Sequence, residues 1–429
     1  MLLNSSRPGK IGILLLMGIV ALSLTFPRTG SSHEPITTKV MFNKEVIRIL
    51  QANCLGCHSE GHVKADIPLT TYEEARPWAK AIKEEVLEKR MMPYQAVKGY
   101  GEFQHDYAVP QRDVELLVSW VDGGAPKGDE KDYPKEAIQK LIKGDTWQQG
   151  QPDLVIQPQK EFRISPEGKN GEDEVRCVSI ATGLKEDKVA AAIDFKPGNG
   201  AIVQSASLYL ERPSVRKAVK AASNKCEMTQ GAELLSTWIP GSRTGKLPDG
   251  YGFMLPAGSK VLMKISYRKP DEEATDLSSI GLYFSKGGET GRFVQDVAVK
   301  SNETVIPANA DRHKVKASYL INENTEAIAI RPVLFPFAKS VEAAAFRPDG
   351  TVEVLIWARN YKYNWQPQYF FKNPVNLPKG TRIEVSAYLD NSDKNPNNPS
   401  DSSKSHKFAD TVCELTLATA AQPLRQAKR

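Results

Sequence analysis

The chain has 429 residues, which is too many for one hydrophobic core of ordinary size, so two or three domains are expected. Charged residues make up 25% of the sequence and hydrophobic residues 40%, a balance that is typical of globular proteins and excludes disordered or multi-span membrane chains. The formal net charge of +6 is spread along the chain without a basic block, which argues against nucleic acid as a partner.

The first 35 residues have the pattern of an export segment. Arg7 and Lys10 precede an apolar run over 11–26, and a polar stretch follows. A positive segment before a short apolar segment is typical of a secretory signal peptide. The apolar run rises about 24 Å as a helix, which is less than the ~30 Å hydrocarbon core, but a clear cleavage site is missing. We therefore expect residues 1–35 to be a cleaved signal peptide or a retained membrane anchor, and the protein to be periplasmic or otherwise extracytoplasmic.

Residues 54–58 read Cys-Leu-Gly-Cys-His and carry the strongest chemical signal in the sequence. Two cysteines separated by two residues can each form a thioether with a vinyl group of haem, and the adjacent histidine then binds the iron. A structural or redox Cys-x-x-Cys followed by an unrelated histidine is the alternative. The export segment and the amphipathic pattern over 42–50 favour one covalent haem c on Cys54 and Cys57, with His58 as the proximal ligand.

The sixth iron ligand has to approach from the other face of the haem, and so from a distant part of the chain. Residues 72–89 predict a helix, which ends at Arg-Met-Met-Pro-Tyr over 90–94. A thioether on a loop stiffened by proline suits this role, although methionine is more often a core filler. We expect Met91 to be the distal ligand, with Met92 as the alternative and His105 as a rival. His/Met ligation leaves no open iron position, so it predicts one-electron transfer and not oxygen activation.

The segment over 111–122 predicts a closing helix that stops at Gly-Gly-Ala-Pro. Residues 41–130 as a whole resemble the monohaem cytochrome c domains that are fused to large exported bacterial proteins. The resemblance rests on Pro-Leu-Thr-Thr-Tyr at 68–72, on the methionine loop and on Trp-x-x-x-Gly-Ala-Pro at 120–126. Without gaps, the methionine of that family falls on Met91.

After a polar linker over 131–160, helical periodicity gives way to alternating strands separated by Pro, Gly, Asn and Asp. Arg-Pro-Asp-Gly at 347–350 predicts a hairpin turn, since glycine accepts a positive φ. Similar Leu-Pro-x-Gly strand openings 122 residues apart, at Leu255 and Leu377, indicate two similar domains in tandem. The expected architecture is multidomain: an α-helical cytochrome c domain at 41–130 and two antiparallel, jelly-roll-like β-sandwich domains at 161–312 and 313–420.

Several pieces of this β region resemble the type II copper, ascorbate-dependent monooxygenases of the peptidylglycine-hydroxylating kind, in the bacterial form that follows a cytochrome domain. They lie at 176–178, 195–199, 238–241, 280–284, 363–366 and 390–399. The resemblance implies two jelly-roll-like domains that hold two copper ions through five histidines and one methionine.

The residues at the copper-ligand positions of that family are different in this chain. These positions fall on Gln204, Ser205, Ser266, Val333, Phe335 and Val412. The whole chain has six histidines: His33, His58, His62, His105, His313 and His406. Copper sites of this type need imidazole and thioether ligands, so we expect copper to be absent. We also expect His313 and His406 to be surface residues.

These patterns predict an electron-transfer protein whose copper-free β-scaffold docks a redox protein or a membrane electron-transfer complex; no catalytic residue is assigned. A divergent copper-dependent monooxygenase fed by its own haem is one alternative. A glycan- or peptide-binding module is another, because five aromatic residues are able to stack on sugar rings, although such residues are more often sandwich core. They are Trp357, Tyr361, Tyr363, Trp365 and Tyr369.

Two further features of the β region bear on its chemistry. Three cysteines lie outside the haem motif, and in an oxidising compartment we prefer a disulfide between Cys177 and Cys226 to a pair that includes Cys413. Residues 390–404 are rich in Asp, Asn and Ser, whose oxygens are able to bind Ca²⁺, but a turn-rich loop is the expectation.

Overall fold

The computed structural model describes most of the chain after residue 37. It covers residues 38–91, 96–142, 147–166, 174–213, 226, 232–286, 291–361, 363 and 365–421. The expected export segment at 1–35 lies outside this part of the chain, as do His33 and Met92. Among the residues described, no helix is long and apolar enough to cross a membrane.

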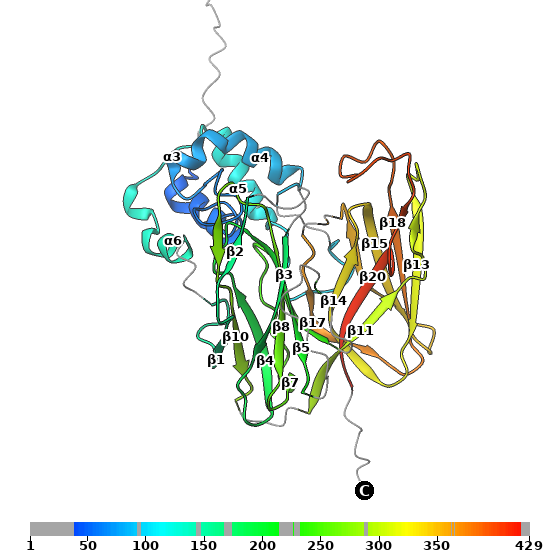
Figure 1. Ribbon diagram of the computed structural model, residues 1–429. Helices are drawn as coiled ribbons and strands as arrows, with labels where there is room; N and C mark the ends of the chain where they lie inside the picture. Colours follow the sequence, from blue (N-terminus) through cyan, green and yellow to red (C-terminus); the bar gives the residue numbers. More distant parts are fainter. Residues whose placement is uncertain are drawn as a thin grey trace, which may run out of the picture.

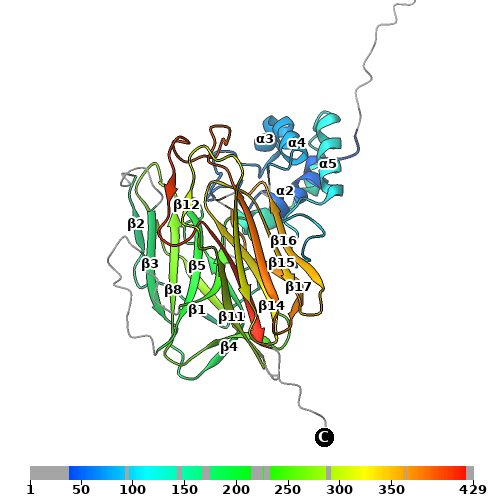
Figure 2. The ribbon, with the colours of Figure 1, turned by 90° about the vertical axis from the view of Figure 1, so that its right-hand side faces the viewer.

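Helices come first along the chain and cover one end of the strands (Figure 1, Figure 2). They are η1 (Phe42–Val46), α2 (Ile47–Asn53), α3 (Tyr72–Ala75), η2 (Arg76–Trp78), α4 (Ala79–Leu87), α5 (Gln111–Asp122), η3 (Glu130–Asp132) and α6 (Lys135–Ile142). The π-helical turn η1 runs directly into α2, and η2 joins α3 to α4.

Local sequence explains where these helices begin and break. The Thr71 side chain accepts a hydrogen bond from the backbone N–H of Glu74, whose carboxylate accepts one from the N–H of Thr71, so α3 begins with a capping box. The helix expected over 72–89 is present but is interrupted by η2, where Pro77 lacks the N–H that a continuous α-helix needs. The helix expected over 111–122 is confirmed as α5.

The helices enclose a hydrophobic core of their own. Its largest fully buried side chains include Phe42, Ile47, Leu50, Leu55, Leu117 and Trp120. The indole N–H of Trp120 donates to the carbonyl of Pro126 at 3.0 Å, which closes the Trp-x-x-x-Gly-Ala-Pro segment back onto α5. Helix α6 adds the buried Ile138 to this core, although the sequence pattern placed it in the polar linker at 131–160.

The rest of the described chain is predominantly antiparallel β-structure, so the protein is mainly a β protein with fewer helices. The first ten strands are β1 (Leu154–Ile156), β2 (Phe162–Ile164), β3 (Glu174–Ala181), β4 (Lys188–Lys196), β5 (Val203–Glu211), β6 (Glu233–Trp238), β7 (Tyr251–Leu255), β8 (Lys260–Tyr267), β9 (Ala274–Asp276) and β10 (Ser279–Phe284). The others are β11 (Arg292–Lys300), β12 (Val305–Ile306), β13 (His313–Leu320), β14 (Thr325–Leu334), β15 (Ala338–Phe346), β16 (Val352–Arg359), β17 (Tyr369–Leu377), β18 (Arg382–Leu389), β19 (His406–Lys407) and β20 (Cys413–Ala421).

The strands form two sandwich-like units that share one sheet. An eight-stranded sheet has the order β1-β10-β4-β7-β11-β20-β14-β17, and its two halves are joined by a short parallel pairing of β7 with β11. Separate four-stranded sheets, β3-β8-β5-β6 and β13-β18-β15-β16, belong to the first and second unit, and each unit has its own hydrophobic core. We call these units the first and second sandwich. The boundary expected at 312/313 stays a prediction, because β11 pairs with strands of both units.

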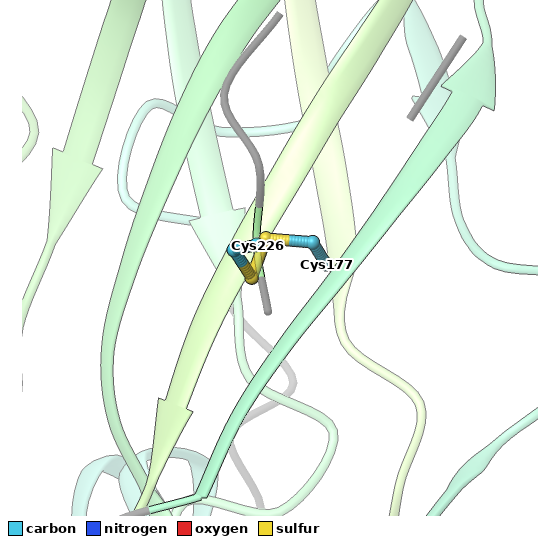
Figure 3. Close-up of a disulfide and its surroundings, with 2 residues drawn as sticks. All are labelled: Cys177 and Cys226. Atoms are coloured by element: carbon cyan, nitrogen blue, oxygen red, sulfur yellow. A yellow bond between two sulfur atoms is a disulfide. The ribbon is translucent and has the colours of Figure 1, made fainter. Parts of the chain in front are cut away.

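Three local predictions for the β region are confirmed. The turn at 347–350 joins β15 to β16, with Gly350 at a φ of 86°. In β18 the alternate residues from Ile383 to Leu389 are buried, as a strand with one face in the core requires. Cys177 and Cys226 form a disulfide with their Cα atoms 5.6 Å apart (Figure 3).

Candidate functional site

The Cys-x-x-Cys-His segment forms a tight turn at the end of α2. The backbone N–H of Cys54 still donates to Leu50 at 2.7 Å, and the N–H groups of Cys57 and His58 both donate to the carbonyl of Cys54, at 3.0 and 2.9 Å. Leu55, between the two cysteines, is fully buried in the helical core and holds the turn in place. The structure therefore presents both thiols and the imidazole from one short, fixed segment.

The ring of His58 is oriented by a hydrogen bond on its Nδ1 side. Nδ1 lies 3.0 Å from the carbonyl oxygen of Ile67, and the residue is only 9% exposed. Because a carbonyl only accepts hydrogen bonds, this contact places the ring proton on Nδ1 and leaves the lone pair on Nε2. Metal-binding histidines are commonly held in this way, with one ring nitrogen donating to a backbone carbonyl and the other free to bind the metal.

The two thiols of the motif are partly buried and form no bond with each other. Neither Cys54 nor Cys57 takes part in a disulfide. Burial raises the pKa of Cys54 to about 12 and that of Cys57 to about 11, and Lys64 lowers the second value only partly. A redox Cys-x-x-Cys depends on a thiol with a lowered pKa, so this environment favours the haem interpretation over the redox alternative.

These residues fit a covalently bound haem c. The group needs two thiols at this spacing and one imidazole nitrogen with a free lone pair, and the turn supplies all three. Over the described part of the chain, no cluster of three or more His, Cys, Asp or Glu side chains is arranged to hold a bare metal ion. Haem does not need such a cluster, because the porphyrin supplies four of the iron ligands.

The expected distal ligand lies at the end of the α4 segment. The backbone N–H of Met91 is 3.4 Å from the carbonyl of Glu85, and the residue is 43% exposed. The preceding Arg90 is paired with Glu84 and Glu85 at 3.0 and 2.9 Å. The backbone of Met91 is therefore attached to the α4 segment, while its side chain is not buried in the helical core. Its role as an iron ligand stays a prediction. Met92 lies outside the described residues.

The four other histidines of the described residues have polar or charged neighbours away from the turn or within its own segment. The Nδ1 atom of His62 lies 2.9 Å from the hydroxyl of Ser59. Burial lowers the pKa of His105, and the nearby charge of Arg243 lowers it further. Two more lie on the second sandwich and are partly exposed: His313 contacts Glu303 at 2.9 Å, and His406 contacts Ser400 at 3.1 Å.

The turn over 54–58 packs against loops of the first sandwich. A Cβ atom at Gly241, in the loop after β6, would lie 3.7 Å from the sulfur of Cys57. In the same loop, a guanidinium nitrogen of Arg243 lies 3.5 Å from the carbonyl of Ala52. Arg268, after β8, donates to the carbonyl of Val63 at 2.8 Å. The first sandwich thus contacts the turn on the side of the Cys57 sulfur.

The loop after β6 is itself held firmly by buried polar contacts. The carboxylate of Asp194 accepts hydrogen bonds from the hydroxyl of Thr244 and the backbone N–H of Gln148, both at 2.7 Å. Burial raises the pKa of Asp194, and these donors oppose the rise. The Trp-Ile-Pro-Gly segment at 238–241 is one of the pieces that carry the second resemblance. No sequence pattern predicted its contact with the turn over 54–58.

The six positions that the second resemblance assigned to copper fall into two groups, one in each sandwich. Ser205 of β5 lies directly opposite Ser266 of β8, beside Gln204. In the second sandwich, Val333 lies opposite Glu414, and Val412 is fully buried next to Cys413. Phe335 follows β14 and its ring lies 4.1 Å from that of Phe408. The side chains at these positions offer hydroxyl, amide and hydrocarbon groups, which are poor copper ligands.

The candidate calcium loop already holds a cation from the protein. The ammonium of Lys339 lies 3.3 Å from a carboxylate oxygen of Asp390 and 3.2 Å from the side-chain oxygen of Asn395. The other oxygen of Asp390 accepts from the backbone and hydroxyl of Ser392. Residues 390–404 therefore use their oxygens internally, as the expected turn-rich loop does.

Most of the aromatic cluster belongs to the interior of the second sandwich. Tyr361, Trp365 and Tyr369 are at most 7% exposed. Tyr363 is 52% exposed, and the ring of Trp357 packs edge-on against Tyr100 at 4.8 Å. Three of the five rings are thus not accessible for stacking on a sugar.

No family model matches the chain, and no curated protein matches it. Among solved structures, the chain is similar to PNGF-II, at 9% identity and a TM-score of 0.29, over 72% of this chain and 71% of that one. It is also similar to allantoicase from Saccharomyces cerevisiae, at 8% identity and a TM-score of 0.16, over 58% and 79% of the two chains. A tandem CBM22 domain from Paenibacillus barcinonensis gives 10% identity and a TM-score of 0.15, over 62% and 93%. Similarities at these scores carry no argument about function.

Proposed function

We propose that the protein is an exported monohaem c-type cytochrome that transfers single electrons. The observation that supports this most strongly is the turn after α2, where two partly buried thiols are followed by a histidine whose Nδ1 is held by the carbonyl of Ile67. Each feature meets one requirement of haem c, namely two thioethers and one imidazole nitrogen aimed by a hydrogen bond.

In this proposal, each residue of the turn has one role. Cys54 and Cys57 hold the haem through thioethers, and Nε2 of His58 is the proximal ligand. The contact with Ile67 fixes the ring and increases the basicity of the imidazole. Met91, or Met92 in its place, is the distal ligand and favours the reduced iron. Bound haem would supply reversible one-electron chemistry, and the buried side chains of α2 and α5 hold the turn on the helical core.

We assign the β region a scaffold role. Arg243 and Arg268 bind backbone carbonyls on either side of the haem-binding turn, so the first sandwich fixes the turn relative to the rest of the molecule. The scaffold is proposed to be copper-free and to dock a redox protein or a membrane electron-transfer complex. The Cys177–Cys226 disulfide supports the periplasm or another oxidising compartment outside the cytoplasm as the location.

Neither alternative function gains support from the described residues. A copper-dependent monooxygenase would need imidazole ligands where β5, β8 and β14 carry Ser205, Ser266 and Val333. A glycan-binding module would need exposed rings, and three of its five candidate rings are buried. The monooxygenase alternative remains an outcome of the metal analysis described below.

The test of haem attachment is the intact mass of the denatured protein after expression with a cytochrome c maturation system. We expect the mass of the mature chain to increase by one haem. The double variant Cys54→Ser, Cys57→Ser is expected to show no such increase. A wild-type chain that folds but carries no covalent haem would overturn the proposed function.

A further inference from the structure

Residues 96–107, here called the strap, leave the helical part and run along the second sandwich. The backbone N–H of Val97 donates to the carbonyl of Trp357 at 2.7 Å, and Ala96 pairs with Ala358 of β16. Further along, Phe103 pairs with Phe371 of β17. Strands β16 and β17 are the edge strands of two different sheets, so the strap is bonded to both sheets of this sandwich at their exposed edges.

Side chains anchor the strap as firmly as its backbone. Ala96 and Tyr107, near its two ends, are 2% and 5% exposed and belong to the core of the second sandwich. Between them, the ring of Phe103 lies 5.0 Å from that of Tyr369. The Tyr107 ring packs edge-on against Trp365 at 5.0 Å. These contacts explain why this part of the aromatic cluster is buried.

The strap begins five residues after Met91. On its other side, Met91 follows α4 and is joined to Glu85 through its backbone. Five residues of chain span at most about 18 Å, so docking of Ala96 sets an upper limit on how far Met91 moves from the second sandwich. One attachment belongs to the helical part, and the other belongs to the second sandwich at Ala96.

We propose that the strap is a positioning device for the distal ligand: by docking on β16 and β17, it holds Met91 at the iron. This inference rests on the proposed function, because it concerns a ligand of the haem. It gives the second sandwich a part in electron transfer, since release of the strap would release the methionine and lower the potential of the iron.

Two glycines of the strap provide a matched pair of variants. Gly101 has a φ of +85°, and a Cβ atom there would overlap the carbonyl oxygen of Leu355 and the ring of Phe103. Gly99 has a φ of +88°, but a Cβ atom there meets nothing within 4 Å. Alanine is strained at both positions by the positive φ, whereas only Gly101→Ala also pushes the strap away from β16.

The experiment compares the wild-type holoprotein, Gly101→Ala and Gly99→Ala by intact mass, visible spectrum, midpoint potential and binding of carbon monoxide to the ferrous haem. We expect all three to carry one covalent haem, because Cys54, Cys57 and His58 lie elsewhere. Gly101→Ala should increase the fraction of molecules with an open iron position roughly 5–30-fold, with a lower potential and a gain in carbon monoxide binding. Gly99→Ala carries the backbone strain without the overlap, so it should change these quantities much less than Gly101→Ala does.

The outcomes separate the inference from the proposed function. Absence of covalent haem from the wild type would overturn both. A haem-loaded Gly101→Ala protein with unchanged spectrum, potential and carbon monoxide binding would overturn the inference alone, as would a wild-type haem without methionine ligation. If Gly101→Ala does not fold, Trp357→Ala replaces it, because this change removes the edge-on contact with Tyr100 and leaves the sandwich core in place.

Discussion

The helical part and the β region differ in whether the side chains at their candidate sites are able to bind a metal. At the end of α2, the backbone and the side chains agree: the turn places Cys54, Cys57 and His58 together, and all three are the residue types that haem c needs. In the β region, β5 and β8 place Ser205 directly opposite Ser266, but a hydroxyl group is a poor copper ligand. The comparison teaches that the chemical identity of a few side chains, and not the strand pairing alone, decides whether a site suits a metal.

The largest effect is expected from removal of the imidazole in the helical part. His58→Ala should abolish the low-spin six-coordinate spectrum, because the iron loses its proximal ligand and the ring that Ile67 orients. The matched control is His62→Ala, four residues along the same segment, whose ring contacts Ser59. The measurement is the visible spectrum of each variant in its ferric and ferrous forms. Equal spectral changes in the two variants would contradict the assignment of His58.

Introduction of histidines into the β region tests whether the backbone of β5 and β8 is able to hold a metal. We expect the triple variant Gln204→His, Ser205→His, Ser266→His to bind about one copper per chain, because three imidazoles on β5 and β8 restore the ligand type that the site lacks. Copper is measured after dialysis against a weak chelator. The control is Ser236→His on β6, which adds one imidazole and should retain no copper. A copper-free triple variant would mean that β5 and β8 do not place three imidazoles close enough together to bind copper.

A third change acts on the first sandwich alone. Cys177 and Cys226 are 49 residues apart, so their disulfide is expected to stabilise the fold by about 4 kcal/mol through the entropy of the unfolded chain. The double variant Cys177→Ala, Cys226→Ala should lose most of this free energy of unfolding in denaturant titrations. Its haem spectrum should be unchanged at low denaturant, because neither cysteine is among the residues that contact the turn over 54–58. Loss of covalent haem on removal of the disulfide would contradict the assignment of the thioethers to Cys54 and Cys57 alone.

The smallest expected effect is a pH dependence from Asp296 of β11. Burial raises its pKa to about 7, with Glu233 and Glu414 adding to the rise, while the N–H of Leu234 at 2.6 Å opposes it. Because the folded protein binds the proton more tightly than the unfolded chain, stability should fall as the pH rises from about 4 to 7 and then level off. Asp296→Asn should be more stable than the wild type above pH 8 by about 1–3 kcal/mol, with a flatter profile. A steeper profile in the variant would contradict this assignment.

Much of the local structure was predictable from the sequence because local rules decide it. The helix over 111–122, the glycine turn at 347–350 and the alternation in β18 each depend on residues a few positions apart. The Cys-x-x-Cys-His signal is equally local. The break at Pro77 was also readable, and the continuous helix expected over 72–89 overlooked it.

The features that escaped prediction depend on contacts between distant segments. The strap has no helical or strand periodicity in its sequence, and its backbone pairs with edge strands more than 200 residues away along the chain. The short parallel pairing of β7 with β11, which joins both sandwiches in one sheet, leaves no local pattern. The same holds for the close approach of Gly241 to the turn over 54–58 and for Lys339 among the oxygens of the candidate calcium loop. Tertiary packing, and not local propensity, decides each of them.

The most direct test of the account is metal analysis combined with an optical redox titration of the whole protein, expressed with a cytochrome c maturation system. The account predicts one iron per chain, no copper, and a reversible one-electron transition between low-spin His/Met spectra. Two coppers per chain would contradict the copper-free scaffold and favour the monooxygenase alternative. A folded protein without iron would contradict the central claim that the turn at 54–58 binds haem.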